Sequence, residues 1–441
     1  MILIRGLKAA GKESGQMLIM FALLLPLLFC FVGFGIDFGV AFVTKAQLAK
    51  AADATALTAM LTLGQGQAEA TKLGQAKFAL NYNASSKLNV APPSVNIGFT
   101  TDSQGDPVVN VKDTAQIKTF FIGFAGFPTL TITNYAQATR PPIVLSLVLD
   151  RTGSMNGNGG AAALPGSVED FVGYFMEGTD QLGQVSFAWS GTNDVPITTD
   201  FQTPINNSLR TMKFGDGTYS MGGLQSGFSQ ITGVASPPTN AVKVVVFFTD
   251  GWDNTIQAFL PSPSAPNKVL VEFGGNAATA TDDLENNYLA FIDPNNVELN
   301  NGDGFSGQNP AYPSTVATCE DGSDTSMQNC NGTNTFTPMG GSGDPLGTSP
   351  VSINRINITA EAQYTTYQLA EQMRAQGITV YSIGLGTDIN QTYLQEIAND
   401  PASPYYNPGE PQGVAAFAPA ASDLDSAFHA IASKIILRLT H

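Results

Sequence analysis

Two aspartates in this sequence directly follow apolar runs, each beside hydroxyl side chains. Asp150 follows Ile143–Leu149 and precedes Thr152 and Ser154, and Asp250 follows the run 241–249. Carboxylate and hydroxyl oxygens are hard ligands, which suit Mg²⁺, Ca²⁺ or Mn²⁺. If the chain brings the two aspartates together, we expect them to form a site for a divalent cation.

The elements that must position these residues alternate along the chain. Short, nearly continuous apolar runs are typical of strands that are buried on both faces of a parallel sheet. Such runs occupy 143–149, 241–249 and 378–384, and helical patterns occupy 161–176, 221–231 and 358–376. This alternation predicts an α/β fold with a doubly wound, mostly parallel sheet, in which ligands bind at the carboxyl ends of the strands. Asp150 and Asp250 both fall at such ends.

Three motifs extend this pattern. Asp150-x-Thr152-x-Ser154, Gly215-Asp-Gly-Thr218 and Thr249-Asp250-Gly251 follow one another in the chain. The set resembles the three metal-site loops of von Willebrand factor A (VWA) domains, in the family's order. The resemblance covers the part of the chain that carries the predicted sheet.

The resemblance implies a metal-ion-dependent adhesion site. Thr152, Ser154 and Thr218 would offer hydroxyl oxygens, and Asp150 and Asp250 would supply charge, mostly through bridging water. An open coordination position could then take an acidic side chain from a protein partner. Thr152 stands where serine is commoner and keeps the hydroxyl. Asp216 and Asp253 are not assigned as ligands, and the alternative is that all these residues are ordinary turn and cap residues.

An uncharged segment lies near the N-terminus. Residues 17–36 are long enough for a helix to cross the hydrocarbon core of a bilayer. Arg5, Lys8 and Lys12 precede the segment and Asp37 follows it, so the positive-inside rule places the N-terminus in the cytoplasm and the rest outside. The rival interpretation is a cleaved signal peptide, but the run is long and no small-x-small site follows it closely.

The same region carries a second resemblance. Gly15-Gln-Met-Leu-Ile-Met20, Ile36-Asp-Phe-Gly39 and the segment 47–57 resemble the start of TadE/TadG-like proteins of tight-adherence (Flp) pilus systems. Pilin-like members carry glutamate where this chain has Met20. The resemblance therefore implies an anchored TadG-type protein of the bacterial envelope, held by a single span in the inner membrane, rather than a pilin subunit.

Between the anchor and the α/β domain we expect two further parts. Residues 37–87 are predicted to form an Ala-rich helical stalk, whose alanine face could pack on a partner helix or within its own domain. Residues 88–140 alternate apolar and polar positions with period two, which predicts a small β module. The α/β domain then occupies 141–441 and ends in a helix near 423–435.

A long segment at about 252–356 exceeds what the α/β fold needs. It is rich in Gly, Asn, Pro, Ser and Thr, and it contains Cys319 and Cys330. Such a pair in an exported protein predicts a disulfide, and two free loop thiols are the alternative. Loops of this length beside a ligand crevice are often functional.

Composition narrows the function. The net charge of −16 would repel phosphate, so no nucleic-acid partner is expected. The chain has two histidines, and it lacks both a Gly-x-Ser-x-Gly elbow and a zinc-binding His-Glu-x-x-His motif, so we expect no enzyme. Two hypotheses remain: an anchored protein that binds a protein or pilus component through the cation, or a structural scaffold of the pilus machinery without metal-dependent binding.

Overall fold

The computed structural model describes residues 13–82, 90–188, 190–215, 217–259, 268–274, 288–292, 335–336, 338, 343–349, 351–352 and 355–437. The chain divides into two compact units, with the division between Arg140 and Pro141. Cys319 and Cys330, the predicted disulfide pair, lie outside the described residues, as does Asp216.

The first unit begins with a very long helix. Helix α1 (Glu13–Leu61) is continuous for 49 residues, which confirms that the helix extends beyond the apolar segment. Large apolar side chains from Met17 to Phe38 are exposed on it. Among the described residues, one helix is long and apolar enough to cross a membrane, and it is α1. The mean hydropathy of its most apolar 18-residue window is 2.7.

The second half of α1 is covered by protein. After a 3₁₀ turn (η1, Leu63–Gln65), α2 (Gln67–Asn81) packs back against α1. Ala52, Ala56 and Ala59 are buried in the unit, so this part of the alanine face packs within its own domain. Gly66 permits the reversal, because its φ of 102° lies in a region that residues with side chains rarely adopt.

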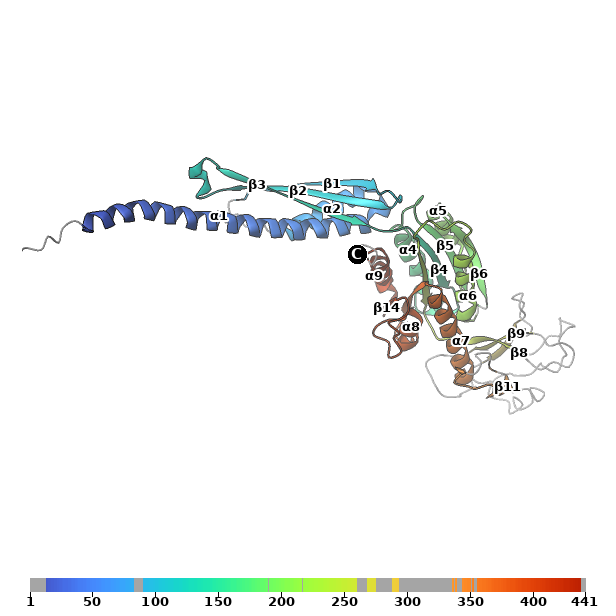
Figure 1. Cartoon of the computed structure of the whole chain (residues 1–441). Helices are drawn as coiled ribbons and strands as arrows, with labels where there is room; N and C mark the ends of the chain where they lie inside the picture. Colours follow the sequence, from blue (N-terminus) through green and yellow to red (C-terminus); the bar gives the residue numbers. More distant parts are fainter. Residues whose placement is uncertain are drawn as a thin grey trace, which may run out of the picture. The chain divides into compact units, whose positions relative to one another are not determined.

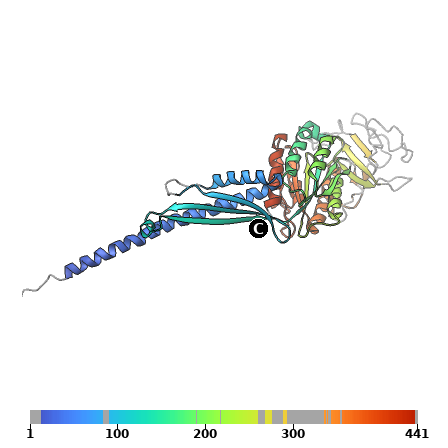
Figure 2. The same cartoon turned by 90° about the horizontal axis from the view of Figure 1, so that it is seen from above.

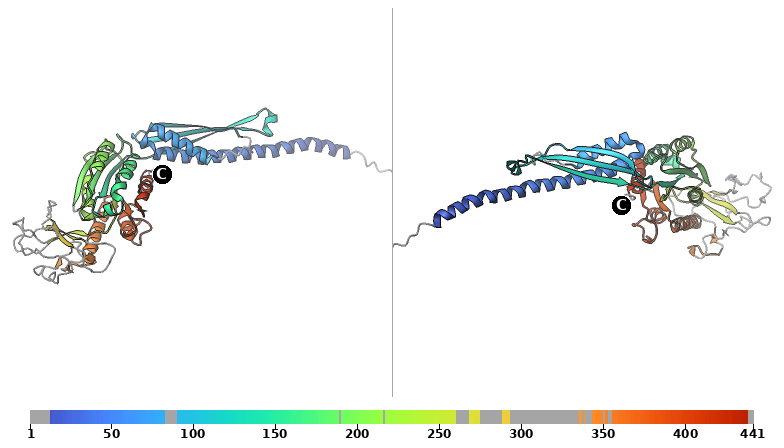
Figure 3. Two further views of the ribbon diagram at one scale, coloured as in Figure 1. Left: turned by 180° about the vertical axis from the view of Figure 1, so that it is seen from behind. Right: turned by 45° about the horizontal axis from the view of Figure 1, so that its top comes forward.

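A three-stranded antiparallel sheet lies along the same helix (Figure 3). Its order is β1 (Ser94–Thr101), β2 (Pro107–Lys118) and β3 (Thr129–Thr139), which confirms the predicted β module. Along β2, from Val109 to Lys118, buried residues alternate with exposed or half-buried ones, as a strand with one covered face requires. Leu48, Phe78 and Ala115 meet in the core between helices and sheet.

The second unit contains a six-stranded sheet of order β14-β13-β7-β4-β5-β6. Its strands are β4 (Ile143–Asp150), β5 (Gln181–Phe187), β6 (Gly191–Thr198), β7 (Val242–Thr249), β13 (Thr379–Leu385) and β14 (Ala415–Ala418). All neighbouring pairs are parallel except β5 and β6. The predicted doubly wound, mostly parallel sheet is confirmed.

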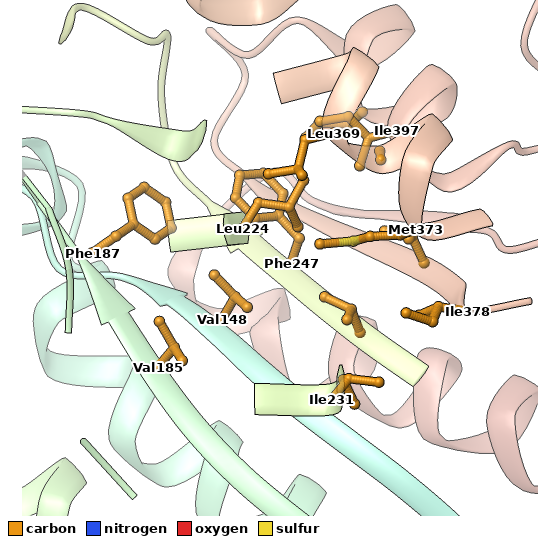
Figure 4. Packing of buried hydrophobic residues seen from close by; sticks show 14 of the residues in the cluster. Val148, Val185, Phe187, Leu224, Ile231, Phe247, Leu369, Met373, Ile378 and Ile397 are labelled. Carbon is orange, nitrogen blue, oxygen red and sulfur yellow. The ribbon is translucent and has the colours of Figure 1, made fainter. Parts of the chain in front are cut away.

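Helices cover both faces of this sheet (Figures 1 and 2). One face packs against α6 (Ser220–Thr232), α7 (Arg355–Ala375) and α8 (Gln391–Ala398), where Val148, Phe247, Leu224 and Met373 meet (Figure 4). The other face packs against α4 (Gly160–Val172) and α9 (Leu424–Leu437), and α5 (Gln202–Thr211) packs beside α4. Rings from these elements pack together: Phe428 contacts Phe171 edge-on and Phe248 in a tilted arrangement.

Some boundaries differ from the predicted ones. Helix α4 ends at Val172 rather than at 176, because Gly173 follows and the chain turns there. The segment after residue 252 contains strands that the sequence analysis did not predict. β8 (Thr255–Phe259), β9 (Lys268–Gly274) and β10 (Tyr288–Ile292) form a small antiparallel sheet, and β11 (Thr335–Phe336) pairs with β12 (Val351–Ser352).

Candidate metal-binding site

The candidate site lies where β4 and β7 end. The two strands are parallel neighbours, with Leu149 opposite Phe248, so their carboxyl ends lie at the same edge of the sheet. Asp150 is the last residue of β4, and Asp250 comes one residue after β7. The strands themselves are buried on both faces, and the polar side chains therefore begin where the apolar layers stop.

Asp150 is completely buried and held by two donors. Its Oδ1 accepts the backbone N–H of Thr152 at 2.8 Å, and its Oδ2 accepts the hydroxyl of Thr249 at 2.6 Å. The first contact fixes the turn after β4, and the second joins β4 to β7. Asp150 therefore orients both loops of the site at once.

A chain of hydrogen bonds runs from the first loop to Asp250. The hydroxyls of Thr152 and Ser154 lie 2.9 Å apart, and Ser154 donates to Asp250 Oδ1 at 2.7 Å. The other oxygen of Asp250 accepts the amide of Asn158 at 2.5 Å. Asp150, Thr152, Ser154 and Asp250 are thus brought together as predicted; their role as ligands stays a prediction.

Thr218 is positioned by its backbone. Its N–H donates to Asn254 Oδ1 at 2.7 Å, and its carbonyl accepts the N–H groups of Asn254 and Thr255. Earlier in the same loop, the N–H of Gly215 donates to the carbonyl of Arg151 at 2.9 Å. The loop that contains Gly215 and Thr218 is therefore hydrogen-bonded both to the loop after β4 and to the loop after β7. These bonds fix the position of the buried Thr218.

The two aspartates disfavour each other's charge. Burial and, next to it, the charge of Asp150 raise the pKa of Asp250 to about 7, against the hydrogen bonds from Ser154 and Asn158. Burial likewise raises the pKa of Asp150, against the hydrogen bonds from Thr152 and Thr249. Without a cation, keeping both buried carboxylates ionised costs free energy, and a nearby positive charge would lower that cost.

The donor set fits a hard divalent cation. The side chains gathered at the site offer carboxylate, hydroxyl and amide oxygens, as Mg²⁺, Mn²⁺ and Ca²⁺ prefer. The described residues contain no group of three or more His, Cys, Asp or Glu side chains able to hold a metal. A cation here would therefore depend on the hydroxyls of Thr152, Ser154 and Thr218 together with water.

Asp253, which the sequence analysis did not assign as a ligand, has a structural position beside the site. Its Oδ1 accepts the N–H of Ser220 at the start of α6, and its Oδ2 accepts the hydroxyl of Tyr393 in α8 at 2.9 Å. A carboxylate at a helix N-terminus is favourable. Burial raises the pKa of Asp253 to about 6. Asp253 therefore ties the third loop to two helices.

Two polar neighbours of the predicted ligands were missed in the sequence, Asn158 and Asn254. Thr249 belongs to the third motif, but its bond to Asp150 was not predicted. Asn254 lies three residues after the third motif, which is a signal of closeness, whereas Asn158 lies outside all three motifs and carried none.

Comparisons with known proteins match two regions of the chain to protein families. Residues 15–68 match the Flp pilus-assembly TadE/G-like family, and residues 145–279 match the von Willebrand factor type A domain. No curated protein sequence matches the chain significantly.

Several solved structures are similar at low identity. Proximal thread matrix protein 1 from the mussel byssus, with a zinc-occupied MIDAS motif, is 13% identical with a TM-score of 0.35, over 67% of this chain and 46% of that one. This chain thus spans about half of that protein's length. The vWF domain of the type V pili tip protein Mfa5 from Porphyromonas gingivalis is 15% identical with a TM-score of 0.39, over 69% and 98%.

A third similar structure is a mutant of the PilB minor pilin from Streptococcus sanguinis, which is 14% identical with a TM-score of 0.37, over 81% of each chain. The two family matches define the architecture: this chain carries a TadE/G-like N-terminal region followed by a von Willebrand factor type A domain.

Proposed function

We propose that this protein is anchored in the bacterial inner membrane and binds a protein partner through a divalent cation held by its VWA domain, in Flp pilus assembly or adhesion. The observation that carries the proposal is the continuous hydrogen-bonded path from Thr152 through Ser154 to Asp250, beside the buried Asp150. It joins two strand ends into one cluster of oxygen ligands.

Each residue of the proposed site has a separate task. Ser154, Thr152 and Thr218 would contribute neutral hydroxyl oxygens, and Asp150 and Asp250 would balance the charge largely through water. Because few carboxylates would bind directly, the cation would keep an electrophilic position that can accept an acidic side chain of a partner. The chain's own part is to hold these oxygens in place, which the contacts of Asn158 and Thr249 do.

The anchor is the apolar part of α1, with residues 17–36 in the bilayer. Support comes from the exposure of its large apolar side chains and from the TadE/G-like match that begins at residue 15. With the N-terminus in the cytoplasm, the VWA domain lies in the periplasm or outside the cell. An oxidising compartment would also allow the pair Cys319 and Cys330 to form a disulfide.

We propose binding rather than catalysis for this site. The sequence has two histidines, and the ring of His429 in α9 lies within hydrogen-bond distance of the hydroxyl of Tyr174, in the turn after α4. The groups gathered at the strand ends are hydroxyls, amides and carboxylates that already bond to one another. Such a set offers cation ligands more readily than an activated nucleophile.

A structural scaffold is the second candidate, and one observation favours it. Both carboxylate oxygens of Asp250 already accept hydrogen bonds, from Ser154 and from Asn158. The network could therefore stabilise the domain without any cation. The two candidates differ in whether divalent ions bind at all.

Calorimetric titration of Mn²⁺ and of Mg²⁺ into the full-length protein in nanodiscs separates them. Under the binding proposal, wild type takes up the cation and Asp250→Asn weakens it at least about tenfold, since a charged ligand is lost. Asp180→Asn is the matched control. Asp180 is also buried, but it accepts the N–H of Ile143 at the opposite end of β4. If wild type and Asp250→Asn bind the cation with equal affinity, or if wild type does not bind it, the binding proposal is wrong and the structural scaffold remains.

A further inference from the structure

The turn between β2 and β3 presents aromatic side chains to the outside. We call residues 120–127 the aromatic tip. Phe124 is 92% exposed and Phe127 is 62% exposed, and Phe120 and Phe121 are also exposed. Clusters of exposed apolar side chains of this kind mark a site of interaction with a protein or a membrane.

The aromatic tip is an ordered structure. Thr119 closes its base, donating its hydroxyl to the carbonyl of Phe127 at 2.7 Å and its N–H to the carbonyl of Pro128. A 3₁₀ turn (η3, Ile122–Ala125) forms the end, and the N–H of Phe127 returns to the carbonyl of Ile122. Because the backbone bonds to itself, the fold of the turn holds the rings of Phe124 and Phe127 outward.

Helix α1 fixes the position of the aromatic tip along its own axis, at Asp37. Asp37 is 2% exposed, and its carboxylate accepts the backbone N–H groups of Phe120, Phe121 and Ile122 at 2.8, 2.9 and 2.8 Å. The hairpin end lies beside the middle of α1 (Figures 1 and 3). Asp37 is the first charged residue after the apolar segment 17–36, so the tip sits where that segment ends.

The contact continues on the apolar side of Asp37. Gly33 is buried against Phe121, and a Cβ atom added at Gly33 would overlap the Phe121 ring. Gly33 lies four residues before Asp37, which is about 6 Å along a helix. If residues 17–36 span the bilayer, the Phe121 ring therefore lies below the level of Asp37, among the acyl chains.

We propose that the aromatic tip inserts into the leaflet from which α1 emerges and forms a second, interfacial membrane anchor. This rests on the proposed placement of residues 17–36 in the bilayer. Aromatic and apolar side chains that lie about 5–10 Å into the boundary of headgroups and acyl chains bind membranes in this way. Backbone groups at that depth must find partners, and Asp37 supplies them for three N–H groups.

The charges of the residues around the aromatic tip favour contact with a lipid surface. The sequence has no Asp or Glu between Asp113 and Asp150. Lys118 is exposed at the end of β2, one residue before Thr119, and its positive charge would be attracted to anionic lipid headgroups. The tip thus combines an apolar end with a cationic base.

Tryptophan quenching by lipid tests the proposal in the full-length protein. Trp189 and Trp252, the two tryptophans of the chain, are changed to Phe, and Phe124→Trp supplies the only indole. Nanodiscs of phosphatidylethanolamine and phosphatidylglycerol carry a doxyl quencher high on the acyl chain. The matched control is Gln104→Trp, an exposed position in the turn at the other end of β2, roughly 40 Å away along the 12-residue strand.

We expect the doxyl lipid to reduce emission at position 124 at least about twofold and to leave position 104 unchanged, as interfacial insertion requires. Phe127→Trp should behave like Phe124→Trp. Equal, weak quenching at 104 and 124 would overturn the insertion, as would blue-shifted emission at 124 without quenching, which indicates a protein contact such as a second copy. A wild-type chain that does not enter nanodiscs would instead overturn the proposed anchor.

Discussion

Ser154 donates a hydrogen bond of 2.7 Å to Asp250 although 96 residues separate them in the sequence. The bond crosses from the loop after β4 to the loop after β7, and together with the bond from Thr249 to Asp150 it links the first and third motifs. Ser154 donates its proton to Asp250 and accepts from Thr152, which leaves one lone pair of its hydroxyl oxygen for an ion.

Asn158→Ala should weaken binding of Mn²⁺ about 10- to 100-fold, the range typical for groups that orient metal ligands. Asn158 donates to Asp250 Oδ2 and accepts the N–H of Gly160, so its loss frees the carboxylate to rotate. Calorimetric titration measures the change. The control is Asn156→Ala nearby in the same loop, because Asn156 is exposed and bonds to the carbonyl of Phe214 instead. Similar affinities for both variants would show that Asp250 needs no such support.

Stability without a cation should fall as the pH rises from 5 to 8. The pKa of Asp250 is raised from 3.8 to about 7, so the folded state holds this proton more tightly than the unfolded state does. That stabilisation is complete below pH 4 and is lost as the pH passes 7. Thermal unfolding in EDTA should show a lower Tm at pH 8 than at pH 6. Asp250→Asn, which cannot titrate, should flatten the dependence, and a Tm that rises over this range in wild type would contradict the assignment.

Excess Mg²⁺ or Mn²⁺ should reverse that loss. A ligand present at 100 times its Kd and bound only by the folded state adds about 2.7 kcal/mol of stability. In a domain of this size we expect a Tm increase of several degrees at pH 8. The increase should be absent in Thr218→Ala, although the backbone contacts of Thr218 with Asn254 remain. An equal increase in both proteins would place the cation elsewhere.

Tyr393→Phe should destabilise the domain by about 1–3 kcal/mol, because it leaves one oxygen of the buried Asp253 without its donor. Urea unfolding followed by circular dichroism gives the free energy of unfolding. Tyr405→Phe is the control, since Tyr405 is 69% exposed. Cation affinity should stay within about threefold of wild type, which corresponds to less than 1 kcal/mol. A loss of affinity without a loss of stability would instead make Asp253 part of the binding site.

β4, β7 and β13 are covered on both faces, and each appears in the sequence as a nearly continuous apolar run, so they were predicted. β5 is also buried but was not predicted, because glutamine, glycine and serine interrupt its apolar residues. β6 could not be found in this way. It is the antiparallel edge strand, most of its side chains are partly or fully exposed, and it contains Pro196. β14 is only four residues long, too short for a periodic pattern.

The site was predictable to the extent that its residues are adjacent to strands. Asp150 and Asp250 follow apolar runs, and parallel topology alone brings them to one edge. The partners of Asp253 could not be predicted, because Tyr393 lies 140 residues later in a helix whose packing brings it back. The same holds for Asp37 and the aromatic tip, which meet only because the β2–β3 hairpin folds along α1.

The central claim is most directly tested by locating the ion itself. Anomalous diffraction at the manganese edge, from crystals of the full-length protein grown with Mn²⁺, should give a peak about 2.0–2.6 Å from the hydroxyl oxygens of Ser154 and Thr218. Asp150 and Asp250 should lie around the same peak. A peak elsewhere in the VWA domain, or none within reach of these side chains at saturating Mn²⁺, would contradict the account.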